Sequence, residues 1–231
     1  MGNEPCLQEL FSSIGREYGF DIVNAAYCYE SDLKIAWKRC GSSIDFWVCD
    51  YLRDAPEDIM SSLAVTMYRK MMVDTDCQYP ENVISYLDSD CFVKKNQEKY
   101  LNRQNGLIPY HNGFHKDLRE SYERLMDADL VDEIPRLFLG WLPMREERSV
   151  GRSSKLMRAV FLQRGLDSTE VSDDLLDFCL YSQIASVSLE FAMEPEEKKR
   201  EYLEKIDSYP GHKTYEKILE KNDLSVREVS P

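Results

Sequence analysis

The stretch that decides the fold is Leu175–Phe191, with the sequence LLDFCLYSQIASVSLEF. Large apolar residues recur in it at intervals of three and four, which is the spacing of one face of an α-helix. A neighbouring stripe contains Ser182 and Ser186, one helical turn apart, and Gln183 adjoins the first serine. The pattern predicts a mostly buried helix with a small polar notch.

The residues before this helix predict two strands joined by a polar arm. Residues 136–143 (RLFLGWLP) and 159–163 (AVFLQ) are aromatic, β-branched and apolar, as strands are. Residues 145–158 between them are polar and basic, and they predict a loop or hairpin arm. A Leu-Asp turn and an acidic segment then lead into a helix over 173–191.

The N-terminal half contains a similar succession of elements. A short amphipathic helix over 5–18 and β-like runs over 20–48 precede a core helix that ends near residue 74. Phe46–Met67 and Val160–Gln183 share one plan: a strand, a Leu/Asp step, an acidic cap and an apolar helix. Two strand–helix units that pack on one sheet would explain this similarity. Strand-turn-helix units also recur by chance, so the similarity does not establish a duplication.

Composition limits the classes of function. The 231 residues include 29 Lys and Arg against 42 Asp and Glu, which gives a net charge of −13. This acidity argues against a broad nucleic-acid surface, because such binding needs clustered cations. Hydrophobic residues make up 43%, enough for a real core. The sequence shows no signal peptide and no apolar run approaching the ~18 residues of a membrane span.

The seven cysteines are odd in number and widely spaced, with no C-x-x-C pair, which favours free thiols in a reducing compartment. We therefore expect a cytoplasmic α+β protein, a small sheet flanked by helices, with no membrane partner. Residues 1–112 are expected to form a strand–helix extension that packs on a core of residues 113–231.

The order of strand, polar arm, strand, Leu-Asp turn and a helix beginning VSDDLLDFCLY resembles a known family. It is similar to the SprT-like zinc metallopeptidase domain of bacteria and archaea, a minimal gluzincin. The resemblance covers roughly residues 135–210 and, more weakly, 45–72. In that family the helix carries Y-H-E-L-x-H. Its two histidines bind Zn²⁺ from one helix face, and the glutamate deprotonates the bound water.

This chain departs from the family at the zinc motif. Where the family has H-E-x-x-H, the chain reads Ser-Gln-Ile-Ala-Ser, from Ser182 to Ser186. Serine is a poor zinc ligand, and Gln183 cannot accept a proton from water. Residues 192–209 contain no His or Cys to serve as a third ligand. The resemblance thus implies a degenerate pseudoenzyme without cofactor or catalytic residues, which binds an unknown protein partner.

Two further features are candidates for binding. The one basic segment of the chain predicts either a solvated hairpin or a contact for an anionic partner such as nucleic acid. Its cations are Arg145, Arg148, Arg152, Lys155 and Arg158. His111 and His115 lie four apart in HNGFH, but Gly113 disfavours a helix there by ~1 kcal/mol, so loop histidines are favoured over a metal site.

Two other classes of function stay open. A hydrolase with relocated chemistry predicts a pocket where carboxylates or the loop of His111 and His115 converge, with Gln183 in its lining. A structural subunit of an assembly predicts an apolar surface patch and no pocket. The sequence contains no G-x-S-x-G, G-x-x-x-x-G-K-[ST] or G-x-G-x-x-G motif.

Overall fold

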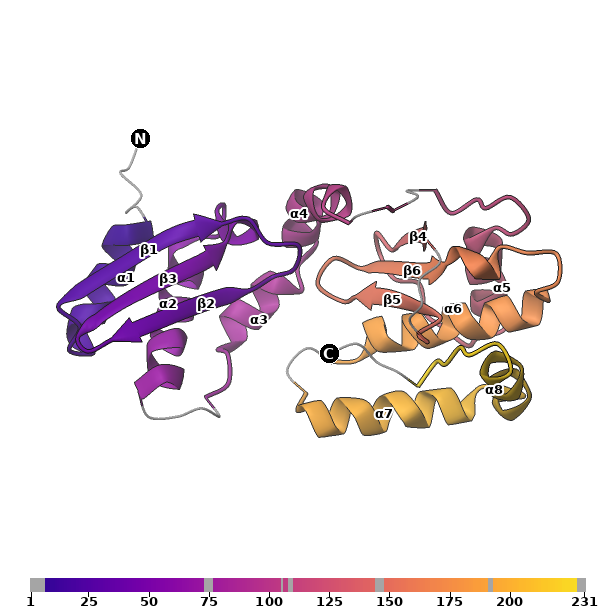
Figure 1. Cartoon of the computed structure of the whole chain (residues 1–231). Coiled ribbons are helices and arrows are strands. Elements are labelled where there is room, and N and C mark those ends of the chain that lie inside the picture. Colours follow the sequence, from indigo (N-terminus) through magenta and orange to yellow (C-terminus); the bar gives the residue numbers. More distant parts are fainter. Residues whose placement is uncertain are drawn as a thin grey trace. The chain divides into compact units, whose positions relative to one another are not determined.

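The computed structural model describes residues 7–72, 77–104, 106–107, 110–143, 148–190 and 193–227. These residues form eight helices and two three-stranded sheets, which confirms the α+β class (Figure 1). The chain divides into two compact units, Met1–Phe92 and Val93–Pro231. In the described residues, no helix combines the length and apolar character needed to cross a membrane.

The N-terminal unit is a three-stranded sheet with helices before and after it. Its elements are α1 (Leu7–Glu17), β1 (Ile22–Cys28), β2 (Ile35–Cys40), β3 (Ser43–Cys49), the 3₁₀ turn η1 (Asp50–Leu52), α2 (Glu57–Met72) and α3 (Glu81–Leu87). Strand β3 lies in the centre, parallel to β1 and antiparallel to β2. Strand β2 reaches β3 through a turn at Gly41, whose φ of 61° suits glycine.

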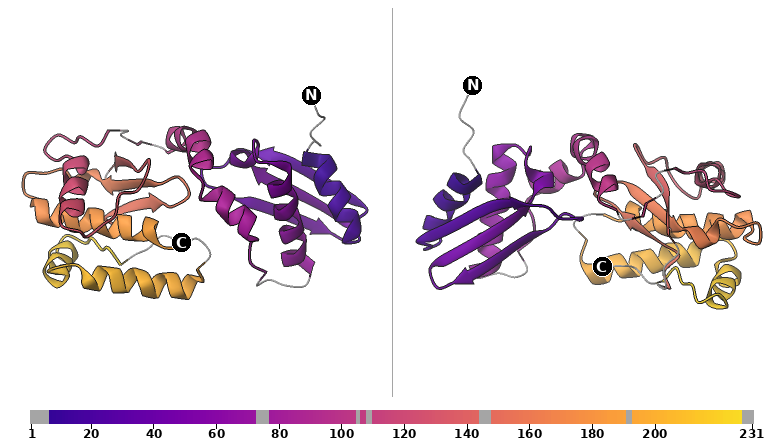
Figure 2. Two further views of the ribbon diagram at one scale, coloured as in Figure 1. Left: turned by 180° about the vertical axis from the view of Figure 1, so that it is seen from behind. Right: turned by 45° about the horizontal axis from the view of Figure 1, so that its top comes forward.

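Helices α1 and α2 cover one face of this sheet (Figure 2, left). Alternate β3 residues, including Phe46, are buried beneath them, as the two-residue period of a strand requires. The centre of the Phe46 ring lies 4.9 Å from the ring centre of Phe11 on α1 and 5.2 Å from the ring centre of Tyr68 on α2. Among the described residues of this unit, no helix covers the opposite face, which Figure 1 turns to the viewer.

The C-terminal unit has the same arrangement with additional helices. It contains most of α4 (Asp90–Asn102), then α5 (Leu118–Asp127), β4 (Phe138–Leu142), β5 (Gly151–Ser154), β6 (Ala159–Gln163), η2 (Arg164–Leu166), α6 (Asp173–Ser188), α7 (Pro195–Ser208) and α8 (His212–Glu220). Central strand β6 is parallel to β4 and antiparallel to β5.

The two units thus share one topology, helix–strand–strand–strand–3₁₀ turn–helix, with strand orders β1-β3-β2 and β4-β6-β5. Their final helices α2 and α6 each have 16 residues. The common topology accounts for the similar succession of residues in Phe46–Met67 and Val160–Gln183. The expectation that both strand–helix units lie on one sheet is wrong, because each central strand already has a strand of its own unit on either side.

The division between the units falls after Phe92, whereas the sequence led us to expect it after residue 112. The reason is that α4 packs on the sheet of the C-terminal unit. The ring of Tyr100 lies 6.4 Å from that of Phe161 on β6, and the Gln97 side chain donates to backbone carbonyls just before β6. Helix α4 therefore covers one face of this sheet and α6 packs against the other.

Helix α6 is the core helix of this unit, as its apolar pattern predicts. Every residue from Leu175 to Ala185 is buried. The Ser172 side chain caps its start by accepting a hydrogen bond from the Leu175 N–H at 3.2 Å. The helix ends at Ser188 rather than at Phe191, which lies outside the described residues.

Candidate functional site

Two of the positions that match the zinc motif, Ser182 and Gln183, lie in the packed core. Ser182 is 0% exposed, and its hydroxyl donates to the Cys179 carbonyl at 2.7 Å. The Gln183 amide lies 3.5 Å from that hydroxyl, and Ser186 is half-buried one turn further on. Burial raises the pKa of Tyr202, which contacts Ser182 from α7, to about 12, so this phenol stays protonated. The notch is therefore filled by protein, and Gln183 lines neither of the two hollows described below.

The two histidines lie in a tight loop and do not share a helix face. The Gly113 N–H donates to the carbonyl of Lys116 at 2.7 Å, which closes the loop. His111 Nδ1 lies 2.8 Å from a carboxylate oxygen of Asp117, whereas the side chain of His115 is exposed. Within the described ranges, no group of three His, Cys, Asp or Glu side chains is placed to hold a metal ion.

Asp167, in the Leu-Asp turn after β6, anchors this loop. Its carboxylate accepts hydrogen bonds from the backbone N–H groups of Phe114, His115 and Lys116, with lengths of 2.6, 2.8 and 2.9 Å. A Cβ on Gly113 would lie 2.4 Å from that carboxylate, so glycine is required there. Burial acts to raise the pKa of Asp167, but the three N–H donors outweigh it and hold the pKa below its ordinary value.

In the part of the chain that the structure describes, the cationic side chains of residues 145–158 do not form one continuous basic surface. Arg152 donates to a glutamine at the end of α4, Lys155 to a carbonyl at the C-terminus of α6, and Arg158 to a carbonyl before β4. Arg148 is exposed, and Arg145 lies outside the described residues. Most of these cations thus stabilise the fold around them.

The outer edge of β4 offers backbone groups for binding. The Phe138 N–H donates to the Arg158 carbonyl at 2.8 Å, toward β6. Because successive residues of a strand point their backbone groups to opposite sides, the N–H and C=O of Leu139 point away from the sheet. No described residue hydrogen-bonds to them from that side.

A groove runs along this edge, between β4 and α5, with a volume of about 380 Å³. Its apolar wall includes Met126, Ile134, Leu137 and Leu139. Arginines and glutamates of α5 and of the segment before β4 stand at its rim, and His111 also lines it. The groove therefore combines apolar surface, charges of both signs and a strand edge.

The equivalent edge of the N-terminal unit is closed. Ala25 on β1 pairs with Phe46 three residues before the end of β3, just as Leu139 pairs with Val160 three residues before the end of β6. The Ala25 N–H donates to the Gln8 side-chain oxygen at 2.7 Å, and the Gln8 amide donates to a carbonyl of β1. One side chain of α1 thus occupies the edge that is free in β4.

The difference follows from how the two helices pack. Helix α1 lies close to β1 because of Gly15, where a Cβ would stand 2.5 Å from the Tyr68 hydroxyl and 2.6 Å from Val23. Helix α5 has no glycine and is tied to α6 instead. Its Arg124 donates two hydrogen bonds, of 2.8 and 2.7 Å, to the buried carboxylate of Asp177.

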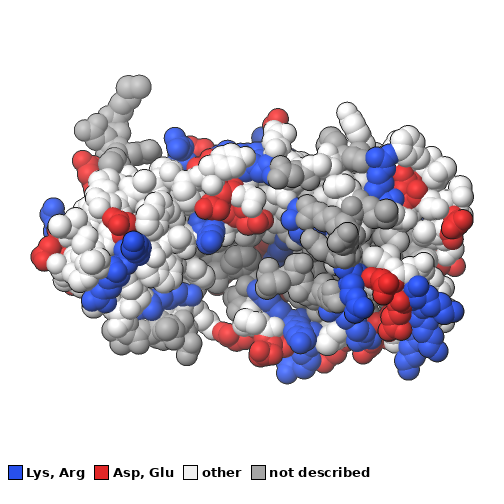
Figure 3. All heavy atoms as spheres, viewed as in Figure 1, with Lys and Arg blue, Asp and Glu red and all other residues white. Residues whose placement is uncertain are grey.

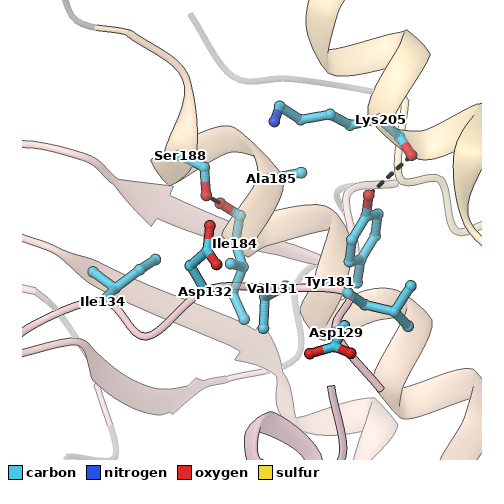
Figure 4. Close-up of a pocket in the computed structure, with 10 residues that line it drawn as sticks. Asp129, Val131, Asp132, Ile134, Tyr181, Ile184, Ala185, Ser188 and Lys205 are labelled. Carbon is cyan, nitrogen blue, oxygen red and sulfur yellow. Dashed lines mark hydrogen bonds between the residues drawn. The ribbon is translucent and has the colours of Figure 1, made fainter. Parts of the chain in front are cut away.

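A second, smaller hollow lies on the other side of Ile134, against α6 (Figure 4). Its volume is about 150 Å³, room for roughly five water molecules. Ile184 forms part of its floor, and Asp132 and Lys205 bring opposite charges to its rim. The Tyr181 hydroxyl donates to the carbonyl of Lys205 at 3.1 Å, which fixes α7 beside the hollow.

Sequence reasoning missed both Leu139 and Gln8. A polar Gln8 in an amphipathic helix just before a strand is a weak signal for a capped edge. Nothing in the residues around Leu139 distinguishes a free edge from a paired one, because that depends on strand order.

Comparison with protein-family models, curated proteins and solved structures found no match for the chain. The order of elements on which the SprT-like resemblance rests is present in the C-terminal unit, from β4 to α6. The same order occurs from β1 to α2 in the N-terminal unit, so element order alone does not distinguish that family.

Proposed function

We propose that this protein acts by binding a protein partner, and that the groove between α5 and β4 takes an extended segment of that partner as an added strand. The observation that carries the proposal is the contrast between two equivalent edges. Gln8 closes the edge at Ala25, whereas the edge at Leu139 is open beside a groove of about 380 Å³.

The chemistry of the groove defines the segment that fits. The backbone groups of Leu139 would pair with an extended chain, which supplies affinity without regard to sequence. Alternate side chains of that segment would point into the apolar wall formed by Met126, Ile134 and Leu137. We therefore expect segments with apolar residues at every second position and polar residues between them.

In this proposal the chain is a non-catalytic relative of the SprT-like domain. Ser182, Gln183 and Ser186 would be the degenerate counterparts of the zinc motif. The burial of Ser182 and Gln183 in the core supports a structural role for them and moves the proposed contact surface away from the former cleft.

The test uses the full-length chain and a phage-displayed library of random peptides. Peptides that bind are synthesised, and their affinity is measured by fluorescence anisotropy for the wild type and for Leu139→Pro and Leu139→Val. Proline removes the N–H of the strand edge, whereas valine keeps it. We expect Leu139→Pro to weaken binding at least roughly tenfold, and Leu139→Val to change it less than about threefold.

Equal binding by the wild type and Leu139→Pro would overturn the proposal, as would the absence of any peptide whose binding depends on this edge. Thermal melts of both variants check that each retains the fold. A folded Leu139→Pro chain is expected, because proline is tolerated at a strand edge.

A further inference from the structure

The bare face of the N-terminal sheet is a second candidate surface, independent of the groove on β4. The side chain of Trp47 on β3 lies on this face, since the alternate residue Phe46 lies under the helices. The register places Ala26 on one side of Trp47 and Ala36 on the other. Because both neighbours are small, the indole of Trp47 projects from the surface of the sheet, and 40% of Trp47 is exposed.

The charge of this face differs from that of the whole chain. Its ionic groups in the three strands are Lys38 and Asp45, which are directly opposed in the ladder, and the Asn24 amide donates to Asp45 at 2.7 Å. The face is therefore neutral in a chain of net charge −13, and Ile22 adds a 58% exposed apolar residue to it. Figure 3 shows this face as mostly uncharged.

The C-terminal unit shows what covers the equivalent face. Trp47 and Phe161 hold the same position, two residues before the end of the central strand and its 3₁₀ turn. Phe161 is 0% exposed, because the ring of Tyr100 on α4 lies over it. Thus one sheet has an amphipathic helix on this face, with an aromatic residue over the central strand. The described residues of the N-terminal unit place no helix on the equivalent face of the other sheet.

We infer that the Trp47 face of the N-terminal unit is a docking site for an amphipathic helix of a partner protein. The helix would lay an apolar, aromatic stripe across β3, as α4 does across β6. Because Lys38 and Asp45 neutralise each other, the docking stripe needs no net charge. An exposed aromatic residue between two small residues is also typical of an interface anchor.

The experiment uses the full-length chain and, as the probe, a phage-displayed library of amphipathic helices of roughly 15 residues with randomised apolar stripes. Selected helices are measured against the wild type, Trp47→Gln, Ala26→Glu and Trp37→Gln. Trp37 is the matched control, because it is 41% exposed but lies opposite Phe46, on the other face of the sheet.

We expect Trp47→Gln and Ala26→Glu each to weaken binding at least roughly tenfold, and Trp37→Gln to change it less than about twofold. The inference is overturned if selected helices bind Trp47→Gln as tightly as the wild type. It is also overturned if sedimentation shows that the wild type self-associates through Trp47, since the occupant is then a second copy. A bound helix that leaves the Leu139 amide unprotected separates this site from the groove on β4.

Discussion

At the scale of single residues, Asp167 shows how one carboxylate fixes a loop. We expect Asp167→Asn to lower the free energy of unfolding by about 1–3 kcal/mol, because it weakens three hydrogen bonds to a charged acceptor. Urea titration measures this change. The control is Glu170→Gln, an exposed acid in the same turn, which we expect to change stability by less than about 0.5 kcal/mol.

The pH dependence of this effect has a defined sign. Since the folded pKa of Asp167 lies below 3.8, its value in an unconstrained chain, the stabilisation is complete above that pH. It is lost as the pH falls through the lowered pKa. The stability difference between wild type and Asp167→Asn should therefore shrink on acidification below about pH 4. A difference that grows on acidification contradicts this account.

Ser182, at the position that the SprT-like resemblance aligns with a zinc ligand, tests whether that position is packed core. We expect Ser182→His to destabilise the protein by about 1–3 kcal/mol, because a ring must enter a site that is already filled. Ser188→His, on the exposed part of the same helix, should be nearly neutral. Calorimetry gives both values. Stabilisation of a Ser182→His, Ser186→His chain by added zinc would show an open ligand site there instead.

At the scale of elements, the contrast between the edges of β1 and β4 can be measured by amide hydrogen exchange. We expect the Leu139 amide to exchange faster than those of Phe138 and Gly140, which point toward β6. The Gln8→Ala variant should accelerate the exchange of Ala25, because it removes the acceptor of that N–H. Slow exchange of Ala25 in Gln8→Ala would mean that another group closes this edge.

Most elements were predictable because their signals are local. Strand β6 covers the predicted residues 159–163, and α6 begins at the predicted Asp173. The separation into two sheets was not predictable, because it depends on which strands pair. The groove depends on long-range packing as well, since Arg124 on α5 is hydrogen-bonded to Asp177 on α6, far away in the sequence.

At the scale of the whole molecule, charge and the repeated topology set the expected partners. With a net charge of −13 and with Arg152, Lys155 and Arg158 bonded within the fold, we expect no binding to duplex DNA near 150 mM salt. Fluorescence anisotropy with labelled DNA measures this. Salt-dependent binding that Arg148→Glu abolishes would restore the basic arm as a nucleic-acid contact.

The two units use one topology in different ways. The N-terminal unit closes its β1 edge with Gln8 and leaves the face at Trp47 bare. The C-terminal unit covers the equivalent face with α4 and leaves the β4 edge open at Leu139. Among the described residues, each unit thus leaves uncovered the surface that the other covers. In our proposals one of these surfaces binds an extended strand and the other binds a helix.

The most direct test of the binding proposal is site-resolved amide exchange at Leu139 with a selected peptide bound. If the peptide adds a strand to β4, the exchange of this amide slows at least roughly tenfold while that of Ala25 is unchanged. Unchanged exchange at Leu139 in a saturated complex would show that the segment binds elsewhere and would contradict the proposed function.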